Sequence, residues 1–435
     1  MKKIILLLFV VISCVAHGQD IPANADKYLV ANTEQQKFSG AVLIAKNDEI
    51  IFDKAYGYAD VADKKLNTIN TEFRAGSLTK MFTSMLIMEL IKENKLSLND
   101  PVSKYIFSAR WADGITIKNL LSHTSGISGT TPANVTSLTA LVEGFHPDSS
   151  HFKPGSRFEY NNFNYLALSY IAQKISGTSF PALIRNKVFE PVGMLHSAID
   201  SFKRTSDDKA LGYTLDPNNN KWVNIGNDES VAAASGAGAL VTTTSDLFTW
   251  SKYVKKKLKQ GDSLFTRATT PVLDNYGLGW INRIQDGHHM IGHTGSIPGF
   301  AAMLMVFPEE NTTIIFLSNF QDMNTRDFIK NIISIAFNET FEMPTVKKRI
   351  ELPEDVLQQY VGTYGQSAQD QLKFFIENKK LVVLAPGGDK VNLAAESKDN
   401  FYLEGPGIII RFNRENEKVV SVFVSMGNQT LKKYQ

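Results

Sequence analysis

The chain has 435 residues, of which 43% are hydrophobic, 21% are charged and 10% are aromatic. This balance is typical of globular proteins with a large core, so it excludes a disordered or a collagen-like chain. The 46 basic residues nearly match the 44 acidic ones, and the net charge of +2 argues against nucleic-acid binding by a broadly basic surface. At about 150 residues per domain, the length allows two or three domains.

The N-terminus has the pattern of an export signal. Two lysines precede an apolar run, 4–12, that is much shorter than the about 20 residues needed to span a bilayer. The small residues at 16–18 then predict a signal peptide over 1–18, and a periplasmic or secreted protein without a transmembrane span. A second interpretation stays open, because 11–14 resembles a bacterial lipobox in which Cys14 carries a lipid anchor at the cell envelope. Cys14 is the only cysteine, so no disulfide is expected within the chain.

The middle of the chain alternates between helical and strand-like patterns. Short apolar runs between turn residues predict strands, and apolar residues at helical spacing predict helices. In chain order, we expect strands at 38–46 and 49–57, helices at 77–94, 162–175, 180–189 and 244–258, strands at 276–283, 289–294, 301–307 and 312–319, and a helix at 325–338.

The last part of the chain has the pattern of a separate all-β module. A charged connector that contains prolines spans 344–353. Short strands at regular spacing follow it, with polar turns between them, which predicts a small barrel or sandwich. We therefore expect one large domain over 19–345 and a small all-β domain over 346–435. The strands expected in the small domain are 361–364, 373–376, 380–384, 401–403, 408–413 and 419–424.

Ser77 and Lys80 form the first candidate catalytic element, a Ser-x-x-Lys at the start of an apolar helix. At this spacing the two side chains share one helical face, and the helix start places backbone N–H groups beside the serine. A serine hydroxyl is a weak nucleophile that a nearby desolvated lysine can activate. The same pattern occurs at 150–153 and 206–209, so by itself it also suits an ordinary helix-cap serine.

Tyr160-Asn161-Asn162 is the second element, and the chain has no other Tyr-x-Asn. Beside a lysine ammonium, a tyrosine can have its phenolate stabilised and can shuttle protons. The amide of Asn162 can bridge that lysine and a substrate carbonyl. A buried tyrosine at a loop–helix junction, with the asparagine as helix cap, explains the same residues without catalysis.

His293-Thr294-Gly295 is the third element, and it lies in a strand-rich region with further glycines nearby. A glycine there lets another backbone lie close, so the N–H of Ser296 could form an oxyanion hole with the N–H of Ser77. The side chains of His293 and Thr294 could bind a substrate carboxylate. A hairpin with a surface histidine is the structural alternative.

The three elements, in this order, resemble the serine β-lactamase and penicillin-binding-protein superfamily, and most of all its class C β-lactamase and DD-peptidase branch. Residues 120–126 and 238–247 are similar to segments that brace the site in that family. The tail, with 360–364, resembles the lipocalin-like barrel appended to many of these hydrolases. The resemblance implies an α+β fold: an antiparallel sheet flanked by helices, a helical subdomain, and a small all-β barrel-like domain.

The resemblance also implies acyl transfer without a cofactor. Ser77 would attack a carbonyl of a cell-wall peptide, β-lactam or ester, Lys80 and Tyr160 would move its proton, and water would cleave the acyl-enzyme. Class C β-lactamases carry a lysine where this chain has His293, so the fixed charge that holds a carboxylate is partly lost at neutral pH. We expect a DD-peptidase-like or penicillin-interacting enzyme. Its turnover of carboxylate-bearing substrates should weaken as His293 deprotonates, between about pH 5.5 and 7.5.

Several alternatives use the same or neighbouring residues. An esterase or a D-aminopeptidase of the same family would use the same machinery, whereas a peptidoglycan-binding protein would use it without catalysis. An α/β-hydrolase would need Gly-x-Ser-x-Gly, which the chain lacks. His288, His289 and His293 suggest a metallohydrolase, but no His-Glu-x-x-His accompanies them, so no metal is expected. We interpret His123 as a structural residue rather than a catalytic base.

Overall fold

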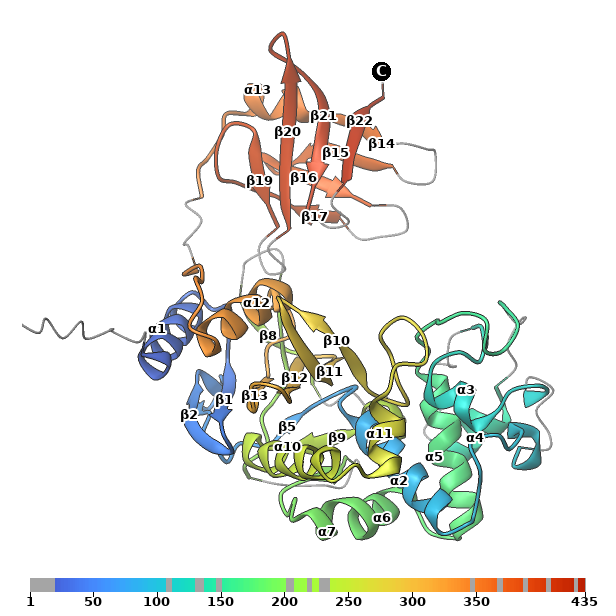
Figure 1. The fold of residues 1–435 in the computed structure, drawn as a ribbon. Coiled ribbons are helices and arrows are strands. Elements are labelled where there is room, and N and C mark those ends of the chain that lie inside the picture. The colour runs from blue at the N-terminus through green and yellow to red at the C-terminus, as the bar shows by residue number, and fades with distance from the viewer. Residues whose placement is uncertain are drawn as a thin grey trace, which may run out of the picture.

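A computed structural model of the chain has a central sheet, a helical region beside it and a C-terminal barrel-like sheet (Figure 1). The expected signal peptide, Cys14 and the expected domain boundary at 345 lie outside the described residues. The structure describes residues 20–106, 112–129, 137–145, 151–200, 207–216, 221–226, 235–344, 349–365, 371–385, 390–403, 408–425 and 429–434.

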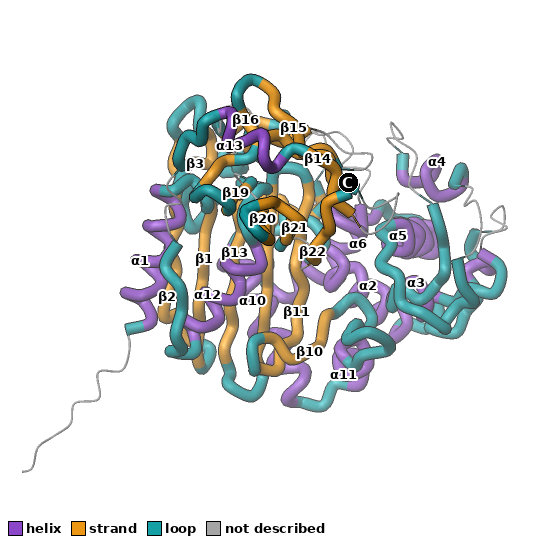
Figure 2. Tube along the Cα trace, turned by 90° about the horizontal axis from the view of Figure 1, so that it is seen from above, coloured by secondary structure: helices purple, strands orange, loops and turns teal. Residues whose placement is uncertain are grey.

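The central sheet has six strands in the order β10-β11-β12-β13-β1-β2, and every neighbouring pair is antiparallel. The first strand of the chain, β1, therefore pairs with the last strand of this sheet, β13, and β2 forms the outer edge beyond β1 (Figure 2). The strands are β1 (Gly40–Lys46), β2 (Glu49–Tyr56), β10 (Ile281–Gln285), β11 (His288–Ile297), β12 (Phe300–Phe307) and β13 (Thr312–Ser318).

The inner strands β1, β12 and β13 are buried on both faces, because their side chains alternate between two cores. On β1, Ala41 and Leu43 belong to one core, and Val42 and Ile44 belong to the other. Successive side chains of a strand point to opposite faces, so an unbroken apolar strand needs cover on both sides. The covering helices are α10 (Thr244–Lys259) on the first face, and α1 (Ile21–Glu34) and α12 (Thr325–Ala336) on the second.

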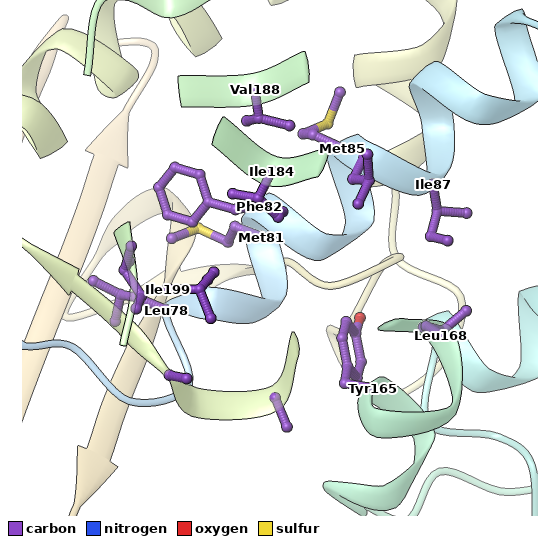
Figure 3. Packing of buried hydrophobic residues seen from close by; sticks show 14 of the residues in the cluster. Leu78, Met81, Phe82, Met85, Ile87, Tyr165, Leu168, Ile184, Val188 and Ile199 are labelled. Atoms are coloured by element: carbon purple, nitrogen blue, oxygen red, sulfur yellow. The ribbon is translucent and has the colours of Figure 1, made fainter. Parts of the chain in front are cut away.

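Helix α2 (Thr79–Lys92) is buried almost all round, and it begins two residues after Ser77. Figure 3 shows its side chains Phe82 and Met85 packed beside Ile184 and Val188. An all-round apolar helix is held by packing, so its first turn is a rigid platform for the residues of a site. The neighbouring helical elements are α3 (Ile117–Leu121), α4 (Leu138–Glu143), α5 (Phe163–Ser176), α6 (Phe180–Ile184), a π-helical turn (Arg185–Phe189) and α7 (Glu190–Val192).

The strand expected at 276–283 begins later than predicted. Residues 276–280 form a turn, and β10 starts at Ile281. Gly279 has a φ of +89°, and a Cβ there would lie 2.9 Å from the carbonyl oxygen of Lys80. The turn packs against α2 through this glycine, which an extended strand could not do. Helix α1 is not among the expected elements, although Asp20 caps it and Pro22 lies in its first turn.

The shorter elements connect these layers. Within the described residues, no helix is long and apolar enough to cross a bilayer. The remaining elements of the large domain are β3 (Tyr58–Asp60), β4 (Lys65–Leu66), β5 (Phe73–Arg74), a 3-10 turn (Val102–Lys104), β6 (Ala198–Ile199), β7 (Tyr213–Leu215), β8 (Trp222–Asn224), α9 (Ser235–Gly238), β9 (Leu240–Thr242) and α11 (Ser263–Thr269).

The C-terminal sheet has nine strands and its own apolar core, which confirms the expected barrel-like all-β module. Phe412 lies at the centre of this core, with ring centroids 4.6 Å from Tyr360 and 5.1 Å from Phe374. The elements are α13 (Glu354–Leu357), a 3-10 turn (Gln358–Tyr360), β14 (Gly362–Gly365), β15 (Leu372–Glu377), β16 (Lys380–Leu384), β17 (Lys390–Asn392), β18 (Ala394–Ala395), β19 (Asn400–Tyr402), β20 (Ile409–Glu415), β21 (Lys418–Val424) and β22 (Gln429–Lys433).

Candidate active site

Ser77 lies in the turn between β5 and α2, beside a free edge of the central sheet. Strand β10 pairs with β11 only from His288 to Gly292, so within the described chain the remainder of β11 has no strand on that side. The turn that carries Ser77 lies against this edge, since a Cβ on Gly295 would lie 2.0 Å from the carbonyl oxygen of Ala75. Only a glycine permits such a close approach of two backbones.

The same approach brings the backbone of Ser296 beside the nucleophile turn. Gly76 has a φ of +52°, and a Cβ there would lie 3.0 Å from the backbone of Ser296. The N–H groups of Ser77 and Ser296 thus belong to adjoining backbones, as an oxyanion hole requires. Ser77 is half-buried, Thr294 is half-buried and Ser296 is exposed.

Lys80 connects the nucleophile to two further segments of the chain. Its Nζ lies 3.0 Å from Ser77 Oγ, 2.8 Å from Asn162 Oδ1 and 2.7 Å from the carbonyl oxygen of Ala237. The side chain is fully buried, and Nζ lies 4.8 Å from the ring centroid of Tyr160. Burial lowers the pKa of Lys80 well below its ordinary value, because the charged form loses its hydration.

The three oxygen atoms around Nζ suit a neutral amine. A neutral amine has two N–H donors and one lone pair. Asn162 Oδ1 and the carbonyl of Ala237 can only accept, so they take the two N–H groups. The lone pair is then left for the hydroxyl hydrogen of Ser77. An ammonium would also satisfy three acceptors, but the desolvated site disfavours the charge.

Tyr160 completes the group, since its hydroxyl donates to Ser77 Oγ at 2.9 Å. Burial raises the pKa of Tyr160 above its ordinary value of 10, and the hydrogen bond with Ser77 only partly opposes this shift. Tyr160 is therefore a neutral phenol and a donor, rather than the phenolate considered from the sequence. The residue is still 42% exposed, so it borders the open side of the site.

Asn162 precedes helix α5, and its side chain makes no capping hydrogen bond. Its neighbour Asn161 takes that role, because Asn161 Oδ1 accepts from the N–H of Phe163 at 2.8 Å. The amide of Asn162 is thus free to face Lys80. The helix-cap interpretation of Asn162 is wrong, and the interpretation as a partner of the lysine is consistent with these contacts.

Both ring nitrogens of His293 are hydrogen-bonded within the protein, which leaves neither for the expected contact with a substrate carboxylate. It is 3% exposed, its Nδ1–H donates to the carbonyl of Thr294 at 2.5 Å, and its Nε2 accepts from the hydroxyl of Tyr276 at 3.0 Å. Burial lowers the pKa of His293 to about 3. This shift moves the titration of His293 below the window of pH 5.5–7.5 that was expected from the sequence.

The other histidines have separate partners. His288 lies between Glu310 and Glu339, and His289 lies between Glu309 and Asn282. Among the residues that the structure describes, no three His, Cys, Asp or Glu side chains are grouped as metal ligands.

The sequence analysis misses two members of the site, the carbonyl of Ala237 and the hydroxyl of Tyr276. A backbone carbonyl has no signature in residue type. Tyr276 precedes Gly277-Leu278-Gly279, and two glycines so close together are a turn signal that was available in the sequence.

The chain is similar in sequence to known proteins of one family. The family model described as Beta-lactamase matches residues 18–335. Penicillin-binding protein 4* of Bacillus subtilis (strain 168) is 26% identical over 412 residues, which cover 87% of this chain and 91% of that protein. Protein flp of Staphylococcus aureus (strain N315) is 28% identical over 378 residues, which cover 80% of this chain and 71% of that protein.

Two solved structures are similar in fold. The octameric penicillin-binding protein homologue from Pyrococcus abyssi has a TM-score of 0.66 at 22% identity, with 96% of this chain and 99% of that one covered. FmtA from Staphylococcus aureus has a TM-score of 0.64 at 23% identity, with 75% of this chain and 90% of that one covered. The matched segment contains Ser77, Lys80, Tyr160 and His293, and the chain belongs to the Beta-lactamase family, with the fold of penicillin-binding-protein homologues.

Proposed function

We propose that this protein is a serine hydrolase that cleaves amide or ester bonds through an acyl-enzyme on Ser77. The observation that carries the proposal is the desolvated amine of Lys80, held 3.0 Å from Ser77 Oγ by two acceptors that leave its lone pair free. A serine becomes a competent nucleophile when such a base lies within hydrogen-bonding reach. A protein that only bound peptidoglycan would have no need of this arrangement.

In this mechanism Ser77 Oγ bonds to the substrate carbonyl carbon while its proton passes to Lys80 Nζ. The carbonyl oxygen takes the resulting negative charge, and the N–H groups of Ser77 and Ser296 stabilise it. The tetrahedral intermediate collapses, the bond to the leaving group breaks, and Tyr160 donates the proton that the leaving group needs, to be restored from Lys80. Water then attacks the acyl carbonyl carbon while one of its protons passes to Lys80. The bond to Ser77 Oγ breaks, Lys80 returns the proton to that oxygen, and the acid product leaves.

The name of a relative, penicillin-binding protein 4*, favours a penicillin-interacting enzyme. A DD-peptidase-like substrate range rests on the resemblance of the sequence motifs. A second candidate, an esterase or D-aminopeptidase, is favoured by His293. Because this imidazole is buried and neutral, it offers no charge to a substrate carboxylate. Neutral esters and amides have no carboxylate, so their binding does not need a positive charge at this position.

Export is also part of the proposal. It rests on the lysines and the apolar run before 18, with cleavage there or lipidation of Cys14 as the two outcomes. The intact mass of the native protein distinguishes them, because cleavage after 18 gives the mass of 19–435 and lipidation adds acyl mass to a chain that begins at Cys14. A native chain that begins at Met1 would contradict export.

The test of the hydrolase proposal compares the wild type with Ser77→Ala. We expect hydrolysis of p-nitrophenyl acetate or labelling by a fluorescent penicillin, and we expect Ser77→Ala to reduce either by more than about a thousandfold. Ser156→Ala is the matched control, because Ser156 is exposed and donates only to the carbonyl of Lys153. Wild-type activity that survives in Ser77→Ala, or no activity with either probe, would contradict the proposal.

A further inference from the structure

His123 lies directly behind the Tyr160 ring and is fully buried. Their ring centroids are 4.3 Å apart, with the planes tilted by 31°. Of the aromatic side chains around His123, Tyr160 is the one whose hydroxyl contacts Ser77. The mechanism above gives His123 no step, so its burial beside the site calls for another explanation.

Both neighbours of Tyr160 in the chain are hydrogen-bonded to His123. The N–H of Glu159 donates to the backbone carbonyl of His123 at 2.9 Å, and the N–H of Asn161 donates to its Nδ1 at 3.1 Å. His123 has a φ of +54°, a left-handed conformation that is uncommon for a residue with a side chain. One residue thus fixes the backbone on either side of Tyr160 and also packs on its ring.

The hydrogen bonds determine the state of the imidazole. Ser125 Oγ donates to Asn164 Oδ1 at 2.8 Å, which turns the Asn164 amide nitrogen toward His123 Nδ1 at 3.2 Å. Nδ1 therefore accepts from two donors and carries no hydrogen, so the hydrogen of the neutral ring is on Nε2. Nε2 has no hydrogen-bond partner among the described residues. An imidazole in this state cannot take the proton of Ser77.

We propose that His123 is a positioning residue that holds the Tyr160 hydroxyl against Ser77, chiefly by accepting the Asn161 N–H at Nδ1. The inference rests on the proposed function, since positioning matters only if Tyr160 transfers a proton. It predicts that the loss of Nδ1 damages the reaction through Tyr160 and not through general unfolding.

Two substitutions separate the contributions of His123. His123→Phe keeps a ring against Tyr160 but removes the acceptor, whereas His123→Asn places an oxygen at the position of Nδ1, tolerates the left-handed backbone and removes the ring. We expect His123→Phe to lower kcat for p-nitrophenyl acetate at least about tenfold with little change in KM, and His123→Asn to stay within about threefold of wild type.

The matched control is Phe158→Leu. Phe158 packs edge-on against His123 at 6.0 Å, and its substitution leaves both hydrogen bonds to His123 in place. It should retain wild-type kcat. A loss in Phe158→Leu equal to that in His123→Phe would mean that packing alone matters, and it would overturn the inference.

A double-mutant cycle with Tyr160→Phe shows whether His123 acts through the tyrosine hydroxyl. We expect the double variant His123→Phe, Tyr160→Phe to be no slower than Tyr160→Phe alone, because residues that act as a unit are not additive. Losses that multiply would overturn the inference while Ser77-dependent hydrolysis kept the proposed function intact.

Crystal structures give a readout that does not depend on turnover. In His123→Phe the distance between the Tyr160 hydroxyl and Ser77 Oγ should exceed hydrogen-bond length, whereas it should remain near the present 2.9 Å in His123→Asn and Phe158→Leu. An unchanged distance in His123→Phe would overturn the inference even if the protein proved to hydrolyse neither probe.

Discussion

At the scale of single residues, the site depends on which groups are uncharged. Lys80 and Tyr160 both have pKa values shifted toward their neutral forms, and burial is the main cause for each. The sequence motifs predicted that Ser77, Lys80, Tyr160 and Asn162 would meet, and they do. Residue types alone could not predict the protonation states, because these depend on how much water the fold removes.

The pH dependence of hydrolysis tests the state of Lys80. The base must be neutral, so kcat/KM should rise with pH as Lys80 loses its proton, at a pH well below 10.5. The pKa of Tyr160 is raised, so deprotonation of Tyr160 should not lower kcat/KM below pH 10. Lys80→Arg should be inactive at every pH, since a guanidinium does not release its proton. The exposed Lys118→Arg is the control. A rising limb near 10.5, or an active Lys80→Arg, would show that Lys80 is not the neutral base.

Two histidines should affect stability with opposite signs. His293 has a lowered pKa, about 3 against 6.5, so its contribution is present above pH 6.5 and is lost as the pH falls toward 3. His288 has a raised pKa because of Glu310 and Glu339, so its contribution is present below pH 6.5 and is lost as the pH rises above it. Urea unfolding from pH 4 to 8 measures both.

The substitutions His293→Gln and His288→Gln isolate the two slopes. In His293→Gln the free energy of unfolding should fall less than in the wild type as the pH decreases. In His288→Gln it should fall less than in the wild type as the pH increases. Equal pH profiles for the wild type and both variants would contradict the assignment of charge states.

At the scale of elements, the site exists because a turn lies against an unpaired strand edge. The strands of the sheet were largely predictable, since their apolar runs are bounded by turn residues. The pairing of β10 with β11 ends at Gly292, and this end was not predictable. It depends on how residues 276–280 pack against α2. Helix α1 was predictable in principle, because its buried residues Ile21, Ala25 and Tyr28 have helical spacing.

Gly295→Ala tests this contact directly. A Cβ at 295 would lie 2.0 Å from the carbonyl oxygen of Ala75, so β11 and the Ser77 turn must separate. Overpacking of this kind costs about 1–3 kcal/mol of unfolding free energy. The oxyanion site should also widen, so we expect the rate of acylation to fall at least about tenfold. The complete loss of one oxyanion donor lowers the rate by about 10²–10³. Gly287→Asn is the control, because Gly287 has a φ of +90° and open space around its Cβ position. Normal acylation in Gly295→Ala would contradict the account.

At the scale of the whole molecule, the two apolar cores around the sheet and the core of the nine-stranded module share no residues. The sequence predicted this division from the connector at 344–353, although the boundary itself stays a prediction. It did not predict the full set of strands, since β18 has only two residues and carries no periodic pattern.

Phe412→Ala tests the independence of the small domain. Deleting this buried ring should cost about 3–5 kcal/mol of unfolding free energy in the C-terminal module, while hydrolysis at Ser77 is unchanged. All four tryptophans precede residue 345, so their fluorescence reports the large domain only, and circular dichroism reports both. We expect the dichroism transition to shift and the fluorescence transition to stay. A common shift, or a parallel loss of activity, would show that the two parts unfold as one.

The central claim is that Ser77 becomes acylated. The most direct measurement is peptide mapping by mass spectrometry after a short incubation of the purified protein with benzylpenicillin and, separately, with p-nitrophenyl acetate, each quenched with acid at successive times. The account predicts an adduct on the peptide that contains Ser77, which forms and then decays, and which is absent in Ser77→Ala. An adduct on another residue, or turnover of both probes with no adduct on Ser77 at any time, would contradict it.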